Sequence, residues 1–146
     1  LKIACPEMEL TLLDSLGKRM AWLAETLSSL NITASCITAR AEEAVASRRE
    51  QFDFAVSRAV ARLPVLCELC LPYVKVGGAF LSMKGAAAQE EVREARQAIA
   101  LLGGRLEQLV TFSIGGAEHA VAVIRKVRPT PPAYPRRFGK IKQQPL

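Results

Sequence analysis

The chain has 146 residues, of which half are hydrophobic and 23% are charged, and this is enough for one domain with a sizeable core. No apolar run approaches the roughly 18 residues that would cross a bilayer, and no charged segment followed by an apolar one marks the start as a secretory signal. We therefore expect a soluble globular protein with no membrane partner.

The formal net charge of +6 is concentrated near the C-terminus. Positions 125–146 hold seven Lys or Arg residues, no Asp or Glu, and five of the eight prolines. A basic, proline-rich tail of this kind favours an anionic partner, although a solvated tail that only aids solubility is the alternative. We divide the chain into a domain over residues 1–128 and a tail over residues 129–146.

The four cysteines, Cys5, Cys36, Cys67 and Cys70, show no secreted spacing, which suits a reducing cytoplasm. Cys67 and Cys70 have the spacing of a redox or zinc pair, but they lie in an apolar helical pattern. A second cysteine pair is missing and there is one histidine, so we expect core cysteines and no metal.

Strand and helix patterns alternate along most of the chain. In chain order we expect a strand over 8–14, a helix over 17–30, a strand over 33–39, a helix over 42–51, a strand over 52–59, a helix that begins near Pro64, a strand over 79–85 and a helix over 86–104. The period then changes, because 105–114 and 119–127 are two consecutive strand patterns joined by a Gly-Gly turn. The sequence therefore predicts an α/β fold with a mostly parallel sheet and an antiparallel C-terminal hairpin.

Asp14 is the last residue of the first expected strand. Ligands of such sheets bind at the carboxyl ends of the strands, where an acid can accept hydrogen bonds from ribose hydroxyls. A helix N-cap is an equally good interpretation of Asp14. Lys18 and Arg19 follow in the first helical turn, where cations oppose the helix dipole and so are poorly explained by helix stability. A ribose-binding acid normally follows a strand, a glycine-rich turn and a helix, and residues 1–9 contain no such turn, so we expect the chain to begin just after its first βα unit.

Several long motifs occur in order along the whole chain: "LLDSLGKRMAWL", "TARAEEA", "FDFAVSRAVARLPVLCELCLP", "GGAFLSMKG", "LGGRLE" and "YPRRFGKIKQQPL". With them the chain resembles the bacterial glucose-inhibited division protein B family, whose members are small-subunit (16S) ribosomal RNA guanine-N7 methyltransferases. The resemblance implies a class I, Rossmann-like methyltransferase fold that uses S-adenosylmethionine. It also implies that the family's first βα unit, with its G-x-G-x-G turn, is missing from this chain.

The resemblance places cofactor contacts on specific residues. Ala41 and Glu42 of "RAEE" would read the adenine, Arg58 of "SRA" would lie near the methionine end and the methyl group, and Asp14 would hold the ribose. Arg58 is also the residue we expect to matter for catalysis, by pairing with a carboxylate or bracing the target base. The alternatives are a helix-N-terminal acid for Glu42 and a surface ion pair for Arg58.

Guanine N7 has a lone pair and no proton to lose, so its methylation needs alignment more than a strong base. The sequence lacks the D/N-P-P-Y motif of exocyclic-amine methylation and the Pro-Cys nucleophile of cytosine methylation. Basic residues and an aromatic residue would contact the RNA and give salt-dependent binding, whereas no DNA partner is expected. These expected RNA-binding residues are Lys18, Arg19, Lys84, Tyr134, Arg136, Arg137, Lys140 and Lys142. Tyr134 and Phe138 have a structural alternative, which is to pin the tail onto the body.

Two other functions are alternatives to a methyltransferase. A nicotinamide-dependent oxidoreductase would also use a ribose-binding acid, but Tyr73 and Tyr134 are followed at the Tyr-x-x-x-Lys spacing by Gly77 and Phe138. A non-catalytic RNA-binding module would keep the basic surface and bind no cofactor.

Overall fold

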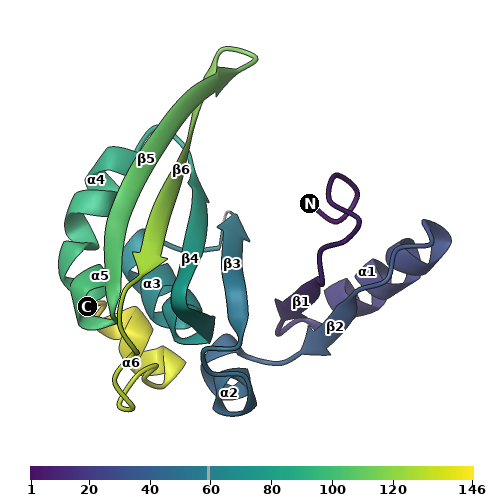
Figure 1. Ribbon diagram of the computed structural model, residues 1–146, viewed down its shortest axis with the longest axis horizontal. Helices are drawn as coiled ribbons and strands as arrows, with labels where there is room; N and C mark the ends of the chain where they lie inside the picture. The colour runs from purple at the N-terminus through teal and green to yellow at the C-terminus, as the bar shows by residue number, and fades with distance from the viewer. Residues whose placement is uncertain (59) are drawn as a thin grey trace. The chain divides into compact units, whose positions relative to one another are not determined.

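A computed structural model describes residues 1–58 and 60–146 of the chain (Figure 1). These residues form two compact units, Leu1–Ala44 and Val45–Leu146. No helix in the described part of the chain has both the length and the apolar character needed to cross a membrane.

The first unit is a βα repeat. Its elements are β1 (Thr11–Asp14), α1 (Gly17–Ser29), β2 (Ser35–Thr38) and α2 (Ala41–Ala44). The two strands are parallel, with Thr11 opposite Ser35 and Asp14 opposite Thr38. Of the apolar face predicted for α1, Met20 is buried to 3% exposure. Because β1 and β2 run in the same direction, both carboxyl ends lie at one edge of this small sheet.

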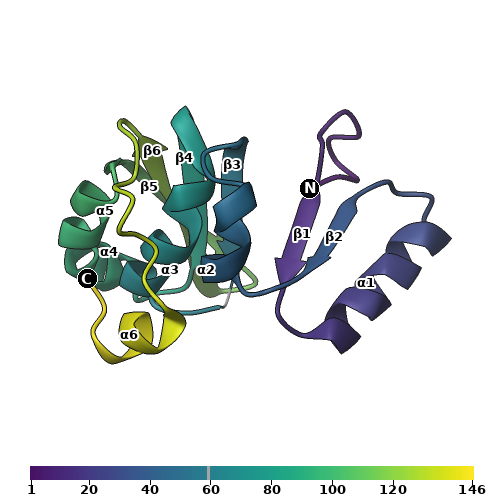
Figure 2. The ribbon, with the colours of Figure 1, turned by 90° about the horizontal axis from the view of Figure 1, so that it is seen from below.

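The second unit contains a four-stranded sheet in the order β3-β4-β6-β5 (Figures 1 and 2). Strand β3 is parallel to β4, and both β4–β6 and β5–β6 are antiparallel. Its elements are η1 (Val45–Ser47), β3 (Phe52–Arg58), α3 (Leu63–Cys70), η2 (Leu71–Tyr73), β4 (Val74–Lys84), α4 (Ala88–Glu94), α5 (Arg96–Leu101), β5 (Gly104–Ile114), β6 (Ala117–Lys126) and α6 (Phe138–Gln143). Gly115 and Gly116 form the β5–β6 turn with φ angles of +58° and +80°, which side chains rarely adopt.

The core of the second unit lies between the sheet and helices α3, α4 and α5, which lie together on one face (Figure 2). Strand β6 shows the alternation that this arrangement requires, because Ala122 and Ile124 are fully buried while Val121 and Val123 are half-buried. Leu63 and Leu66 of α3 and Phe80 of β4 complete the centre of this core.

The structure confirms the predicted α/β class and the C-terminal hairpin, and it moves several boundaries. Strand β4 begins at Val74, not at residue 79, because Gly78 lets the chain continue past a close approach. A Cβ at Gly78 would lie 2.4 Å from the carbonyl oxygen of Asp53. The expected helix over 42–51 ends early, and Glu50 adopts a left-handed φ of +53°. The expected strand over 52–59 is observed as Phe52–Arg58, and Ala59 lies outside the described residues.

The tail after residue 128 is packed against the second unit. Thr130 is 4% exposed and Ile141 of α6 is fully buried. Tyr134 and Leu146 are half-buried against the hydrophobic core cluster. Whether residues 129–146 form a separate functional part stays a prediction.

Candidate functional site

Asp14 ends β1 with both carboxylate oxygens engaged by neighbouring donors. Oδ1 accepts a 2.8 Å hydrogen bond from the backbone N–H of Leu16, and Oδ2 accepts a 2.5 Å bond from Arg19 Nη1. The Leu16 N–H is the largest cause of a lowered pKa for Asp14, and Arg19 adds to it against the opposing effect of burial. Each oxygen keeps a lone pair, so the ionised carboxylate is oriented and still able to accept further bonds.

The contacts of Asp14 also describe the surroundings of Lys18 and Arg19, the two cations that follow it. Leu16 is the residue before helix α1, so Asp14 closes the turn into the helix without bonding the helix's own first N–H groups. The ion pair with Asp14 gives Arg19 a local role that the sequence did not reveal. Lys18 is exposed.

Ala41 and Glu42 begin α2, shortly after β2 ends at Thr38. Thr38 is the register partner of Asp14, and the N–H of Ala39 donates to the Asp14 carbonyl at 3.1 Å. The Glu42 side chain is 9% exposed, and Arg40 Nη1 lies 3.9 Å from its Oε1. The structure therefore brings Asp14, Ala41 and Glu42 to one edge of the β1–β2 pair, and their contact with the cofactor stays a prediction.

Arg58 is the last residue of β3, where it is exposed and lies opposite Met83 of β4. The preceding pair, Ser57 and Ser82, is buried, and neither hydroxyl has a hydrogen-bond partner among the described residues. Sequence reasoning missed these two serines, because a serine within a strand carries no local signal of burial.

Lys84 is half-buried, with a side chain that is 8% exposed. It donates to the Ala61 carbonyl at 2.6 Å and pairs with Glu91 Oε2 at 2.8 Å. The same Glu91 oxygen accepts the N–H of Leu63, the first residue of α3. Lys84 therefore links β4 to Ala61 and to Glu91 of α4, and its contact with RNA stays a prediction.

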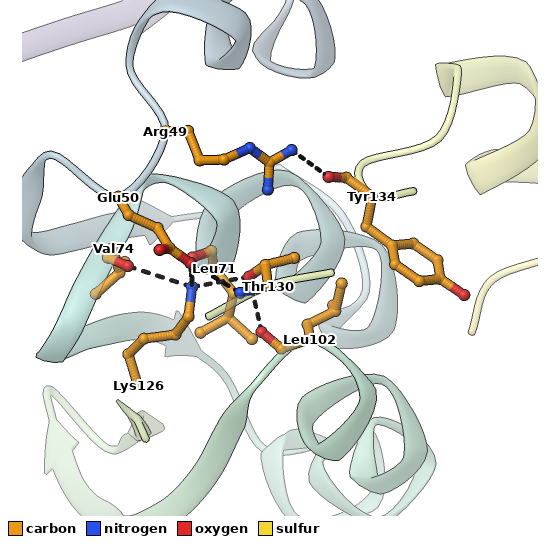
Figure 3. A network of polar contacts seen from close by, with 8 residues as sticks. All are labelled: Arg49, Glu50, Leu71, Val74, Leu102, Lys126, Thr130 and Tyr134. Carbon is orange, nitrogen blue, oxygen red and sulfur yellow. Dashed lines mark hydrogen bonds and ion pairs between the residues drawn. The ribbon is translucent and has the colours of Figure 1, made fainter. Parts of the chain in front are cut away.

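Lys126 is fully buried and organises the polar network in Figure 3. Its ammonium donates to the Leu71 carbonyl at 2.7 Å, the Val74 carbonyl at 3.2 Å and Thr130 Oγ1 at 2.8 Å, and it lies 3.0 Å from Glu50 Oε1. Burial lowers the pKa of Lys126, partly offset by Glu50. Burial alone would raise the pKa of Glu50, but the bonds from the Thr130 N–H and from Lys126 outweigh it and lower that pKa.

In the tail, the predicted RNA-binding residues differ in their surroundings. The Arg136 guanidinium is held by Glu68 of α3, with Nη2 2.6 Å from Oε2. Tyr134 is half-buried, and its carbonyl accepts a 2.5 Å bond from Arg49 Nη2. Arg137, Lys140 and Lys142 are exposed. The structure therefore favours these three, and not Arg136, as surface cations.

The cysteines of the second unit behave as core residues. Cys67 is fully buried and Cys70 packs against the core cluster. Burial raises the pKa of the Cys67 thiol well above its usual range and that of Cys70 to about 12. Within the described residues, no group of three or more His, Cys, Asp or Glu side chains is placed to hold a metal ion.

Solved structures with the same arrangement of strands and helices define the class. An rRNA methylase from Streptococcus thermophilus matches 82% of this chain and 74% of its own, with a TM-score of 0.60 and 17% identity. A 16S rRNA (adenine(1408)-N(1))-methyltransferase from Catenulisporales acidiphilia with cosubstrate SAM matches 88% of this chain and 78% of its own, with a TM-score of 0.68 and 14% identity. The fold is thus the Rossmann-like fold of class I methyltransferases.

The family follows from sequence. The GidB family, described as rRNA small subunit methyltransferase G, matches residues 1–121, and the chain belongs to it. Proteins named ribosomal RNA small subunit methyltransferase G are similar over the whole chain. The one from Clostridium kluyveri is 42% identical over 149 residues (100% of this chain, 63% of its own length), and the one from Acetivibrio thermocellus is 45% identical over 150 residues (99% and 62%). The chain thus spans somewhat less than two thirds of the length of the curated relatives it matches.

Proposed function

We propose that this chain is part of a cytoplasmic enzyme that transfers a methyl group from S-adenosylmethionine to N7 of a guanine in small-subunit (16S) ribosomal RNA. The observation that carries the proposal is the 42–45% identity, over essentially the whole chain, to relatives named for methylation of this RNA. The substrate is small-subunit ribosomal RNA, either free or within a ribosomal subunit.

The residues of the first unit fit the nucleoside part of the cofactor. The Asp14 carboxylate is ionised and oriented, and each of its oxygens can still accept a bond from a ribose hydroxyl. We assign Glu42 and the backbone of Ala41 to the adenine edge, because they begin α2 at the same strand edge.

Bound S-adenosylmethionine supplies a methyl group on a positively charged sulfur. Because N7 of guanine carries no proton, no side chain has to act as a base, and the protein's task is alignment. We assign Arg58 to the methionine end of the cofactor or to the target base, since it is an exposed guanidinium at the carboxyl end of a strand.

Transfer of a labelled methyl group to unmodified small-subunit ribosomal RNA tests this proposal. The assay compares this chain with a chimera that adds the part of the Clostridium kluyveri relative lying outside the match. Transfer by the chimera, lost when Asp14 is changed to Asn, would support both the reaction and the cofactor assignment. RNA binding without transfer by either protein would instead favour a non-catalytic RNA-binding role.

A further inference from the structure

Glu68 and Arg136 form a buried connection between helix α3 and the tail. Glu68 is fully buried, and its Oε1 accepts 2.8 Å bonds from both the backbone N–H and the Nε of Arg136. Its Oε2 accepts a 2.6 Å bond from Arg136 Nη2, which also donates to the Gln144 carbonyl at 3.1 Å. Arg136 thus joins α3, the segment just before α6 and the residue that follows α6.

This geometry explains why the pair persists in the interior. A buried carboxylate is costly unless it is paired and hydrogen-bonded, and the planar fork of an arginine satisfies both oxygens at once. The hydrogen bonds to Glu68 raise the pKa of Arg136. The guanidinium is also 5.9 Å from the centre of the Tyr134 ring. Arg136 is therefore bonded within the protein through its backbone N–H, Nε and Nη2.

The cations that follow Arg136 in the chain differ from it in exposure. Arg137, Lys140 and Lys142 are exposed, whereas Ile141 between the two lysines is fully buried and anchors α6. Residues 125–146 contain seven Lys or Arg residues and no Asp or Glu, and such an excess of positive charge favours an anionic partner. These three side chains are here called the α6 cationic face: Arg137 is the N-cap residue of α6, and Lys140 and Lys142 lie within the helix.

We propose that Glu68 and Arg136 are positioning residues that fix α6, so that the α6 cationic face binds the phosphate backbone of RNA. The RNA part of this inference rests on the proposed function. The positioning part rests only on contacts within the second unit.

RNA affinity distinguishes positioning from direct contact. We would measure binding of this chain to unmodified small-subunit ribosomal RNA, transcribed in vitro, over a range of salt concentrations. Glu68→Gln removes a buried negative charge and keeps the side-chain shape. If Arg136 contacted phosphate, this change would free the cation and leave affinity equal or higher. If the pair positions α6, affinity falls several-fold.

Arg136→Lys sharpens the comparison, because lysine keeps the charge and loses the planar fork. We expect it to lower affinity as Glu68→Gln does, and we expect the double variant to be no weaker than either single one, since both break one connection. Arg137→Ala is the matched control. It should reduce the slope of log K against log salt by about 1 and leave α6 in place.

Hydrogen exchange reports positioning independently of RNA. The amides of Lys140, Ile141 and Gln144 donate within α6 and its flanks. They should exchange faster in Glu68→Gln and Arg136→Lys, and at the wild-type rate in Arg137→Ala. Unchanged exchange in the first two variants would overturn the positioning role even if RNA binds. Absence of RNA binding by the wild-type chain, with faster exchange in those variants, would overturn the RNA part alone.

Discussion

At the scale of single residues, the side chains at the strand ends differ in the contacts that they make among the described residues. Asp14 and Lys84 are held by bonds to their own unit. Arg58, by contrast, is exposed at the end of β3. In the chimera, Arg58→Ala should therefore reduce methyl transfer on the order of a hundredfold, which is typical for loss of one electrostatic contact in a reacting complex.

The same substitution should change the free energy of unfolding by less than about 0.5 kcal/mol, as for other exposed sites. Arg62→Ala is a matched control, because Arg62 is an exposed arginine nearby that pairs with Glu94 at 2.5 Å. It should keep most of the transfer activity. Equal losses of activity and stability in Arg58→Ala would assign Arg58 a structural role.

Glu50 gives the second unit a defined pH dependence. Its folded-state pKa is lower than the ordinary 4.5, so the ionised form stabilises the fold above that pH. This contribution is lost as pH falls below 4.5 through the folded-state pKa. Glu50→Gln should lower stability at pH 7 by roughly 1–3 kcal/mol, because it leaves Lys126 buried without its counter-charge.

Denaturant unfolding at pH 7 and at steps down to pH 3 would measure this effect. The difference between wild type and Glu50→Gln should shrink as the pH falls. The lowered pKa of Asp14 leaves some acid sensitivity in both proteins. A difference that stays constant across this range would contradict the role given to Glu50.

At the scale of elements, the strands and helices follow from local pattern, and the exceptions come from contacts between elements. The pattern placed Asp14 at a strand end and Pro64 in the first turn of a helix, where both are observed. It did not predict that β4 runs through Gly77 and Gly78. In a sequence, two glycines indicate a break, and only the proximity of β3 shows that one of them permits a close approach.

Gly78→Ala should therefore destabilise the second unit by roughly 1–3 kcal/mol or more, because the new Cβ would meet backbone that cannot move aside easily. Gly139→Ala in α6 is the contrasting change, since nothing lies within 4 Å of a Cβ there. Alanine favours helix more than glycine does, so this variant should be up to about 1 kcal/mol more stable. Urea unfolding of both variants measures the two effects, and similar values for both would contradict the close approach at Gly78.

At the scale of the whole molecule, the ion pairs that hold the tail could not be predicted from the sequence. Glu68 and Arg136 are 68 positions apart, and Glu50 pairs with Lys126 and accepts the N–H of Thr130, which is 80 positions away. Local pattern carries no information on such partners. For that reason the sequence could not show that Arg136 and Lys84 pair with acids of the second unit, whereas Arg137, Lys140 and Lys142 are exposed.

The proposed cofactor residues Asp14 and Glu42 belong to the first unit, and the α6 cationic face belongs to the second. Substitutions in the two units should therefore separate the two binding activities of the chimera. Asp14→Asn should weaken S-adenosylmethionine binding, because it removes the negative charge that would accept hydrogen bonds from ribose, and it should leave RNA affinity equal or higher, because it frees Arg19. Lys140→Ala should leave S-adenosylmethionine binding unchanged and weaken RNA binding. It should also reduce the slope of log K against log salt by about 1. Calorimetry with the cofactor and salt-dependent RNA titration would measure both, and a loss of both activities in either variant would mean that cofactor and RNA binding are coupled across the units.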